Sequence, residues 1–144
     1  MKVKYLVISI LAAAFLSSAI DIDRNVGAGK KAPKIETIDG TNVVKDANSE
    51  NKMKVVSFWS PKKPASRIAN RNLSLKYGTG NEEVEFISIC TDPDESLMKE
   101  VMKQDGISET RVFASREISP RVLKDYDAEK NPRVFVIGPD GLLQ

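Results

Sequence analysis

The chain has 144 residues, of which 41% are hydrophobic and 29% charged, a composition that fits one compact domain with an ordinary core. It contains a single cysteine, Cys90, and no histidine. An intramolecular disulfide is therefore excluded, and so are the catalytic pairs and metal clusters that need histidine or several cysteines. The 22 basic and 20 acidic residues nearly cancel, so the charge gives no indication of nucleic-acid binding.

The first 19 residues have the three parts of a secretory signal peptide. Lys2 and Lys4 form a basic start, residues 6–16 are apolar, and residues 17–19 are small enough for cleavage. The apolar run is shorter than the roughly 20 residues that a membrane-spanning helix needs. The sequence therefore predicts a periplasmic or secreted product with no stable membrane anchor after cleavage. A lead-in segment is expected at residues 20–34 and the folded domain at residues 35–144.

Runs of β-branched, aromatic and aliphatic residues predict five strands, at residues 35–37, 41–44, 55–59, 84–90 and 134–137. Asp39-Gly40 joins the first two as a hairpin, because glycine accepts a positive φ without steric cost. The third and fourth runs are apolar on both faces, which is typical of central strands. The fifth run ends at Pro139-Asp140-Gly141, a turn after which a further antiparallel strand is expected.

Three helices are predicted to begin with a proline in their first turn, at Pro64, Pro93 and Pro120. The first is expected to end at Gly78. The second is expected to be capped by Asp92, with Glu95 completing a capping box, and to end at Gly106. Ser119 is the expected cap of the third. Strands that alternate with helices predict an α/β domain in which helices flank a central mixed β-sheet.

Three segments, residues 29–33, 55–59 and 131–141, resemble the thioredoxin-like superfamily. The resemblance is to the exported TlpA/ResA-type thiol-disulfide oxidoreductases and their AhpC/TSA (peroxiredoxin) relatives, and it implies a thioredoxin-like fold. In those relatives the last turn is followed by an edge strand and a helix, whereas this sequence ends at Gln144. The C-terminal helix of the fold is therefore expected to be missing, and either the sequence is truncated or that face of the sheet is covered otherwise.

The resemblance places the former active site at the start of the first helix. Relatives carry Cys-x-x-Cys there, and the two cysteine positions fall on Lys63 and Ser66 of the run Lys63-Pro64-Ala65-Ser66. A helix start stabilises an attacking thiolate, and a second thiol resolves the mixed disulfide that forms. Lys63 and Ser66 do neither, so the resemblance implies a degenerate CxxC without thiol-disulfide or peroxidase chemistry. Pro132 matches a proline that is normally cis and shapes the substrate groove.

The resemblance gives a set of candidate binding residues in this vestigial active-site loop: Trp59, Lys62, Lys63, Pro64, Ser66, Arg67 and Pro132. The three cations surround a helix N-terminus, which favours anions, so they form either a site for an acidic group or a solvated basic loop. Trp59 either packs under the helix or presents its edge to a peptide. Cys90 is expected to be buried by its alternation with Val84 and Phe86, and would have a redox role only if exposed.

Three functions are compatible with the sequence. The first is an exported, redox-inactive binding or accessory module that holds a protein or an extended peptide near Pro132. The second is an enzyme of the thiol-disulfide oxidoreductase type that uses Cys90 or a partner's cysteine, and the third is a structural subunit completed by another chain. The first is favoured because both active-site cysteines are absent. No cofactor is expected, and no metal, because the acidic run at residues 92–95 lacks the spacing of a calcium loop.

Overall fold

The computed structural model describes residues 26–44, 51–78, 81–108 and 111–144. The expected signal peptide and the first part of the lead-in lie outside the described residues. The elements are β1 (Met53–Trp59), α2 (Pro64–Tyr77), β2 (Val84–Cys90), α3 (Glu95–Asp105), β3 (Val112–Phe113), a 3-10 turn (Ser115–Glu117), α4 (Pro120–Asp125) and β4 (Val134–Ile137). Within the described residues, no helix has the length and apolar character needed to cross a bilayer.

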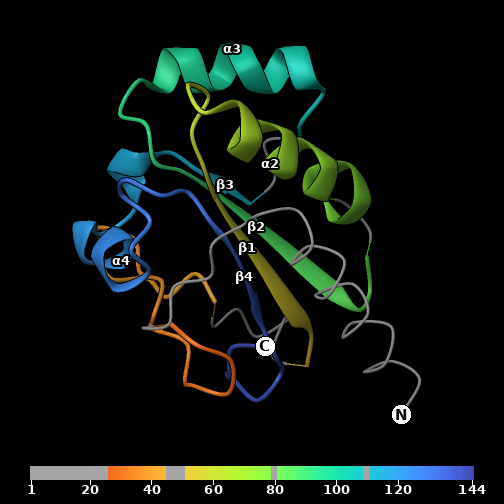
Figure 1. Cartoon of the computed structure of the whole chain (residues 1–144), viewed down its shortest axis with the longest axis vertical. Coiled ribbons are helices and arrows are strands. Elements are labelled where there is room, and N and C mark those ends of the chain that lie inside the picture. Colours follow the sequence, from red (N-terminus) through yellow and green to blue (C-terminus); the bar gives the residue numbers. More distant parts are fainter. Residues whose placement is uncertain (1–25, 45–50, 79–80, 109–110) are drawn as a thin grey trace.

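The strands form one mixed sheet in the order β3-β2-β1-β4 (Figure 1). β1 and β2 are parallel neighbours over their whole length, from Met53 opposite Val84 to Trp59 opposite Cys90. β4 lies antiparallel on the other side of β1, and β3 extends the sheet in parallel beyond β2. The predicted α/β architecture with a central mixed sheet is confirmed, and β2 has the predicted bounds.

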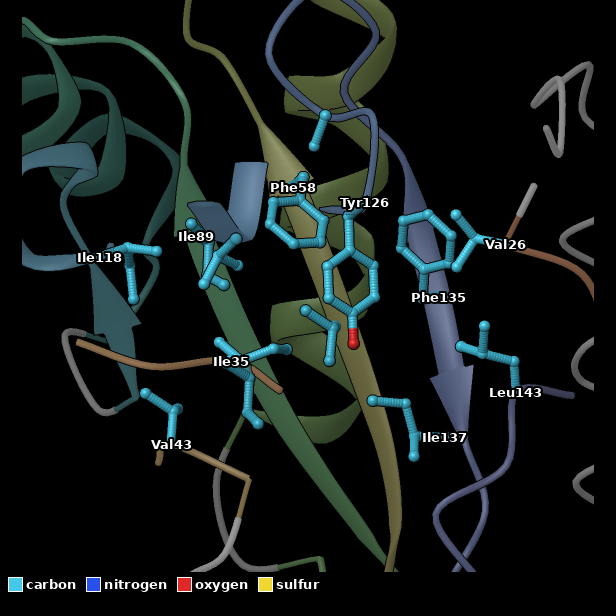
Figure 2. Packing of buried hydrophobic residues seen from close by; sticks show 14 residues of the cluster. Val26, Ile35, Val43, Phe58, Ile89, Ile118, Tyr126, Phe135, Ile137 and Leu143 are labelled. Atoms are coloured by element: carbon cyan, nitrogen blue, oxygen red, sulfur yellow. The ribbon is translucent and has the colours of Figure 1, made fainter. Parts of the chain in front are cut away.

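One face of the sheet carries the larger apolar cluster. Alternate residues of β1 and β2, including Phe58 and Ile89, point to this face and meet Tyr126 at the C-cap of α4, Ile35 of the hairpin and Leu143 (Figure 2). The opposite face, reached by the intervening residues of the same strands, is covered by α2 and α3. Because the strands are buried on both faces, their near-continuous apolar runs are explained.

The predicted hairpin turn is present, but residues 35–37 and 41–44 are not strands: within this turn they are joined by a single bridge, between Glu36 and Asn42. Gly40 has a φ of +86°, and the Thr37 N–H donates to the Thr41 carbonyl at 2.9 Å. At the other end of the domain, a turn with Gly141 at φ +80° sends the chain back antiparallel to β4. There Leu143 bridges Ile137 and Leu142 bridges Lys31, so the expected last strand is present as isolated bridges.

The cap of α3 differs from the prediction. Asp94, not Asp92, is the N-cap, and its carboxylate accepts a hydrogen bond from the Leu97 N–H at 3.0 Å. Pro93 therefore precedes the helix, and Glu95 is the first helical residue instead of the end of a capping box. Either aspartate of this turn is a residue type that caps helices. The Asp92 carboxylate instead accepts a hydrogen bond from the Asp94 N–H at 2.9 Å, one residue before the helix.

Candidate functional site

The candidate site lies where β1 passes into α2. The carboxyl ends of the parallel strands β1 and β2 meet at one edge of the sheet, with Trp59 opposite Cys90. From there residues 60–63 form the loop that leads into α2, at the same end of the sheet as α3 (Figure 1). Pro64 occupies the first turn of α2, as predicted, and Lys63 is its N-cap without a side-chain cap bond.

Ser66 fixes the shape of this loop. Its hydroxyl accepts a hydrogen bond from the Ser60 N–H at 3.1 Å and lies 2.9 Å from the Lys63 carbonyl, to which it can donate. The Ser60 hydroxyl in turn accepts from the Lys62 N–H at 3.2 Å. Two serine hydroxyls thus accept from backbone N–H groups of the loop that leads into α2.

Lys62 and Lys63 tie the loop to two other segments. The Lys62 ammonium lies 3.2 Å from the carboxylate of Asp92, which is buried in the turn between β2 and α3. The Lys63 ammonium donates to the carbonyl of Lys130, in the segment that precedes β4. The Lys62 side chain remains 60% exposed, so its contact with Asp92 leaves most of its surface in water.

Arg67 joins α2 to the end of α3. Its guanidinium donates two hydrogen bonds to Asp105, from Nε at 2.9 Å and from Nη2 at 2.8 Å. These bonds lower the pKa of the Asp105 carboxyl and raise that of Arg67. All three cations of the predicted basic cluster therefore have acceptors within the domain, which a freely solvated loop would not show.

The carboxylates near the site belong to such pairs and caps. Asp92 pairs with Lys62, Asp94 caps α3, and Glu95 lies 2.9 Å from the Lys99 ammonium. The described part of the chain has no group of three histidine, cysteine, aspartate or glutamate side chains arranged to hold a metal ion.

Comparison with known proteins rests on structure, because the sequence matches no protein-family profile and no curated protein. The fold is similar to a thioredoxin-like protein from Parabacteroides distasonis, with a TM-score of 0.68 and 24% identity over 82% of this chain and 85% of that one. The thioredoxin domain of a thiol-disulfide oxidoreductase from Bacteroides vulgatus gives a TM-score of 0.61 and 20% identity over 81% and 85%. A secreted disulfide oxidoreductase of Mycobacterium tuberculosis gives 0.57 and 21% over 78% and 80%.

The chain has the thioredoxin-like fold. Across this thioredoxin-like domain only one cysteine occurs, and it does not lie at the start of α2.

Pro132 lies in the segment that the Lys63 contact ties to the start of α2. The Phe58 N–H donates to the Arg133 carbonyl at 2.8 Å, which holds Pro132 at the edge of the sheet. No peptide bond among the described residues is cis, so the bond before Pro132, which the resemblance left open between cis and trans, is trans. The trans form has the lower intrinsic free energy, by about 0.5–1 kcal/mol. We call the exposed residues Lys62, Lys63 and Pro64, together with the half-buried Pro132, the mouth.

Trp59 and Cys90 are buried below the mouth, in the cluster formed with Met98 and Met102 of α3. Trp59 therefore packs and has no surface for a peptide in this thioredoxin-like domain. Burial raises the pKa of the Cys90 thiol to about 11, the hydrogen bond toward the Asp92 carbonyl acting in the other direction. The thiol is thus neutral near pH 7 and cut off from solvent, as the alternation along β2 predicts.

Cys90 should accordingly resist alkylation in the folded protein. At pH 8 a thiol with a pKa of about 11 is about 0.1% thiolate, and the thiolate is the reactive form. We expect no more than slow modification by iodoacetamide in native buffer and one full equivalent in guanidinium chloride, followed by mass spectrometry. Rapid stoichiometric labelling of the native protein would contradict the burial of this thiol.

The Arg67–Asp105 pair should make stability depend on pH in a defined direction. A carboxyl whose folded pKa is lowered stabilises the fold above its unfolded pKa of about 3.9, and this contribution is lost as the pH falls through the folded pKa. Arg67→Met should lower the Tm by a constant amount between pH 6 and 8, and the difference from wild type should shrink at acid pH. Circular dichroism melts measure this, with Arg121→Met as control because Arg121 is exposed on α4. A difference that grows in acid would contradict it.

A layer of buried polar side chains under α2 was not predicted from the sequence. Ser57 and Ser88 are opposite each other on β1 and β2, and both are buried. The Ser88 hydroxyl donates to the side-chain oxygen of Asn70 at 2.8 Å, and Asn70 is itself fully buried on the sheet side of α2. The sequence does contain one indication of this layer: Ser57 and Ser88 each interrupt an otherwise apolar run, and the two runs pair as β1 and β2.

Proposed function

We propose that this thioredoxin-like domain is an exported, redox-inactive binding module that holds a protein or an extended peptide at the mouth. The observation that carries the proposal is the chemistry at the start of α2, where Lys63 and Ser66 occupy the positions that cysteines would need. The remaining thiol, Cys90, is buried and protonated at neutral pH. No dithiol can form, and the burial of Cys90 argues against the alternative of an oxidoreductase that uses this residue.

The shape of the mouth supports binding without chemistry. Lys62, Lys63 and Pro64 are exposed, yet hydrogen bonds and ion pairs hold their loop to the α3 turn and to the segment before β4. Such contacts restrain the loop before a partner docks, so the binding surface loses less conformational entropy on docking. Export is supported by the N-terminal sequence pattern and by the similarity to a secreted oxidoreductase of the same fold.

Two measurements test this function. In the insulin reduction assay with dithiothreitol, the wild-type protein should give the rate of the buffer alone. A rate above that background which Cys90→Ser abolishes would favour the oxidoreductase alternative instead.

The binding function is tested by photo-cross-linking. A photoactivatable residue at position 63 should cross-link to a protein or peptide of the exported fraction, and the same residue at position 34, exposed in the lead-in, is the matched control. Cross-linking from both positions alike, or from neither, would contradict binding at the mouth.

A further inference from the structure

Helix α2 carries a second apolar line on the side that faces away from the sheet. Its sheet side buries Asn70, Leu73, Ser74 and Tyr77. Ile68 and Leu75 are instead 59% and 62% exposed, and only one other large apolar side chain of the described residues is comparably exposed, Ile38 at 66%. Single exposed apolar residues are normal on a protein surface. Two large apolar side chains exposed along the same side of one helix instead indicate a surface for a binding partner.

The line has the spacing of a helix-packing seam. Ala65, Ile68, Asn72 and Leu75 are all exposed and follow one another at intervals of three, four and three residues. This is the alternation of a and d positions through which helices pack, with asparagine as one a residue, where it fixes register. We call these four residues the outer seam of α2.

The charges beside the outer seam have one sign. Arg71 and Lys76 occupy the flanking g and e positions, both are exposed, and α2 contains no acidic residue. Arg71 also lies near enough to Asp105 to lower the pKa of that carboxyl, but Asp105 is bonded to Arg67 on the α3 side. Charges at e and g positions select the partner helix, so two cations select acidic residues.

We propose that the outer seam docks an amphipathic helix of a partner protein that carries apolar residues at its a and d positions and acidic residues beside them. The proposal rests on the binding function above and names the chemistry of the partner. A second copy of this chain would bring Arg71 and Lys76 against their own counterparts, which repel. A membrane surface fits less well, because the seam is narrow and contains Asn72, whereas interfacial helices insert a broad apolar face.

The test uses two synthetic helices of about three heptads, with leucine at a and d and either glutamate or lysine at e and g. Fluorescence anisotropy should show binding of the glutamate peptide and not of the lysine peptide. Combining Ile68→Ser and Leu75→Ser should raise the Kd of the glutamate peptide at least about tenfold. Ile38→Ser is the matched control, since it removes the comparably exposed side chain away from α2, and should leave the Kd unchanged.

A second variant keeps the outer seam and reverses its charge. Arg71→Glu with Lys76→Glu should transfer binding to the lysine peptide, and circular dichroism should show that the fold is retained. Equal binding of both peptides, or a Kd that neither double variant changes, overturns the proposal.

Two further outcomes also overturn it: binding to phosphatidylglycerol vesicles that the double serine variant abolishes, and a dimer in sedimentation that the same variant dissociates. Cross-linking from position 63 that persists in this variant, together with a Kd of the glutamate peptide that the variant does not change, would refute the docking helix and leave the mouth as the binding site. Binding of the glutamate peptide at the outer seam without cross-linking from position 63 would refute only the proposal that the mouth binds a partner.

Discussion

Phe58→Ala is expected to lower the free energy of unfolding by about 3–5 kcal/mol, the range for removing a large aromatic side chain from a packed core. Phe58 is fully buried on β1, and its ring centroid lies 5.2 Å from that of Tyr126 and 5.9 Å from that of Phe135 (Figure 2). These three rings come from β1, the C-cap of α4 and β4, so the substitution removes a contact that links three parts of the fold.

Equilibrium unfolding in urea, followed by circular dichroism, measures this loss. Ile38→Ala is the control, because Ile38 is mostly exposed and its truncation should change the free energy by less than about 0.5 kcal/mol. If Phe58→Ala lowers stability no more than the control does, the contacts of Phe58 with Tyr126 and Phe135 do not stabilise the core as expected.

The second large effect is a gain of activity. Lys63→Cys together with Ser66→Cys should give the protein insulin reductase activity that the wild type lacks. Position 63 is the N-cap of α2, where the helix dipole and free N–H groups lower a thiol pKa. Ser66 already points its side-chain oxygen back at the Lys63 carbonyl, at 2.9 Å, so a thiol in its place lies beside position 63.

The rate of insulin precipitation with dithiothreitol measures the gain. Lys63→Cys alone is the control, because one thiol at the mouth forms mixed disulfides that no neighbour resolves. Should the double variant be folded but no faster than the single one, the loop has lost the geometry for redox chemistry as well as its cysteines. In both variants we expect the Cys90 thiol to stay unmodified, because neither substitution changes the residues that bury it.

Much of the fold follows from local sequence. The apolar runs that became β1 and β2 have β-branched and aromatic residues on both faces, which fits no exposed element of the same length. Pro64 and Pro120 mark the starts of α2 and α4 because a proline is tolerated only in the first turn of a helix. β3 was not predicted, because a strand of two residues has no alternation to detect.

The candidate site could be predicted only in part. The loop between β1 and α2 and the burial of Cys90 follow from short segments, so they could be placed. The acceptors of Lys62, Arg67 and Lys63 could not, because they lie 30, 38 and 67 residues further along the chain. The predicted cap residue of α3 was wrong for a related reason. Asp92 and Asp94 are equivalent in the local sequence, and the tertiary contact of Asp92 with Lys62 is what distinguishes them.

The pairing of the segment around Lys30 with the segment around Leu143 has a practical consequence. The Leu143 N–H donates to the Lys30 carbonyl and the Gly29 N–H to the Leu143 carbonyl, so these two segments lie side by side. They lie next to the end of β4, where Ile137 pairs with Lys54 at the start of β1, and β1 runs from there toward the mouth. A domain attached to a support through Gln144 would therefore present its mouth to the solution, away from the point of attachment.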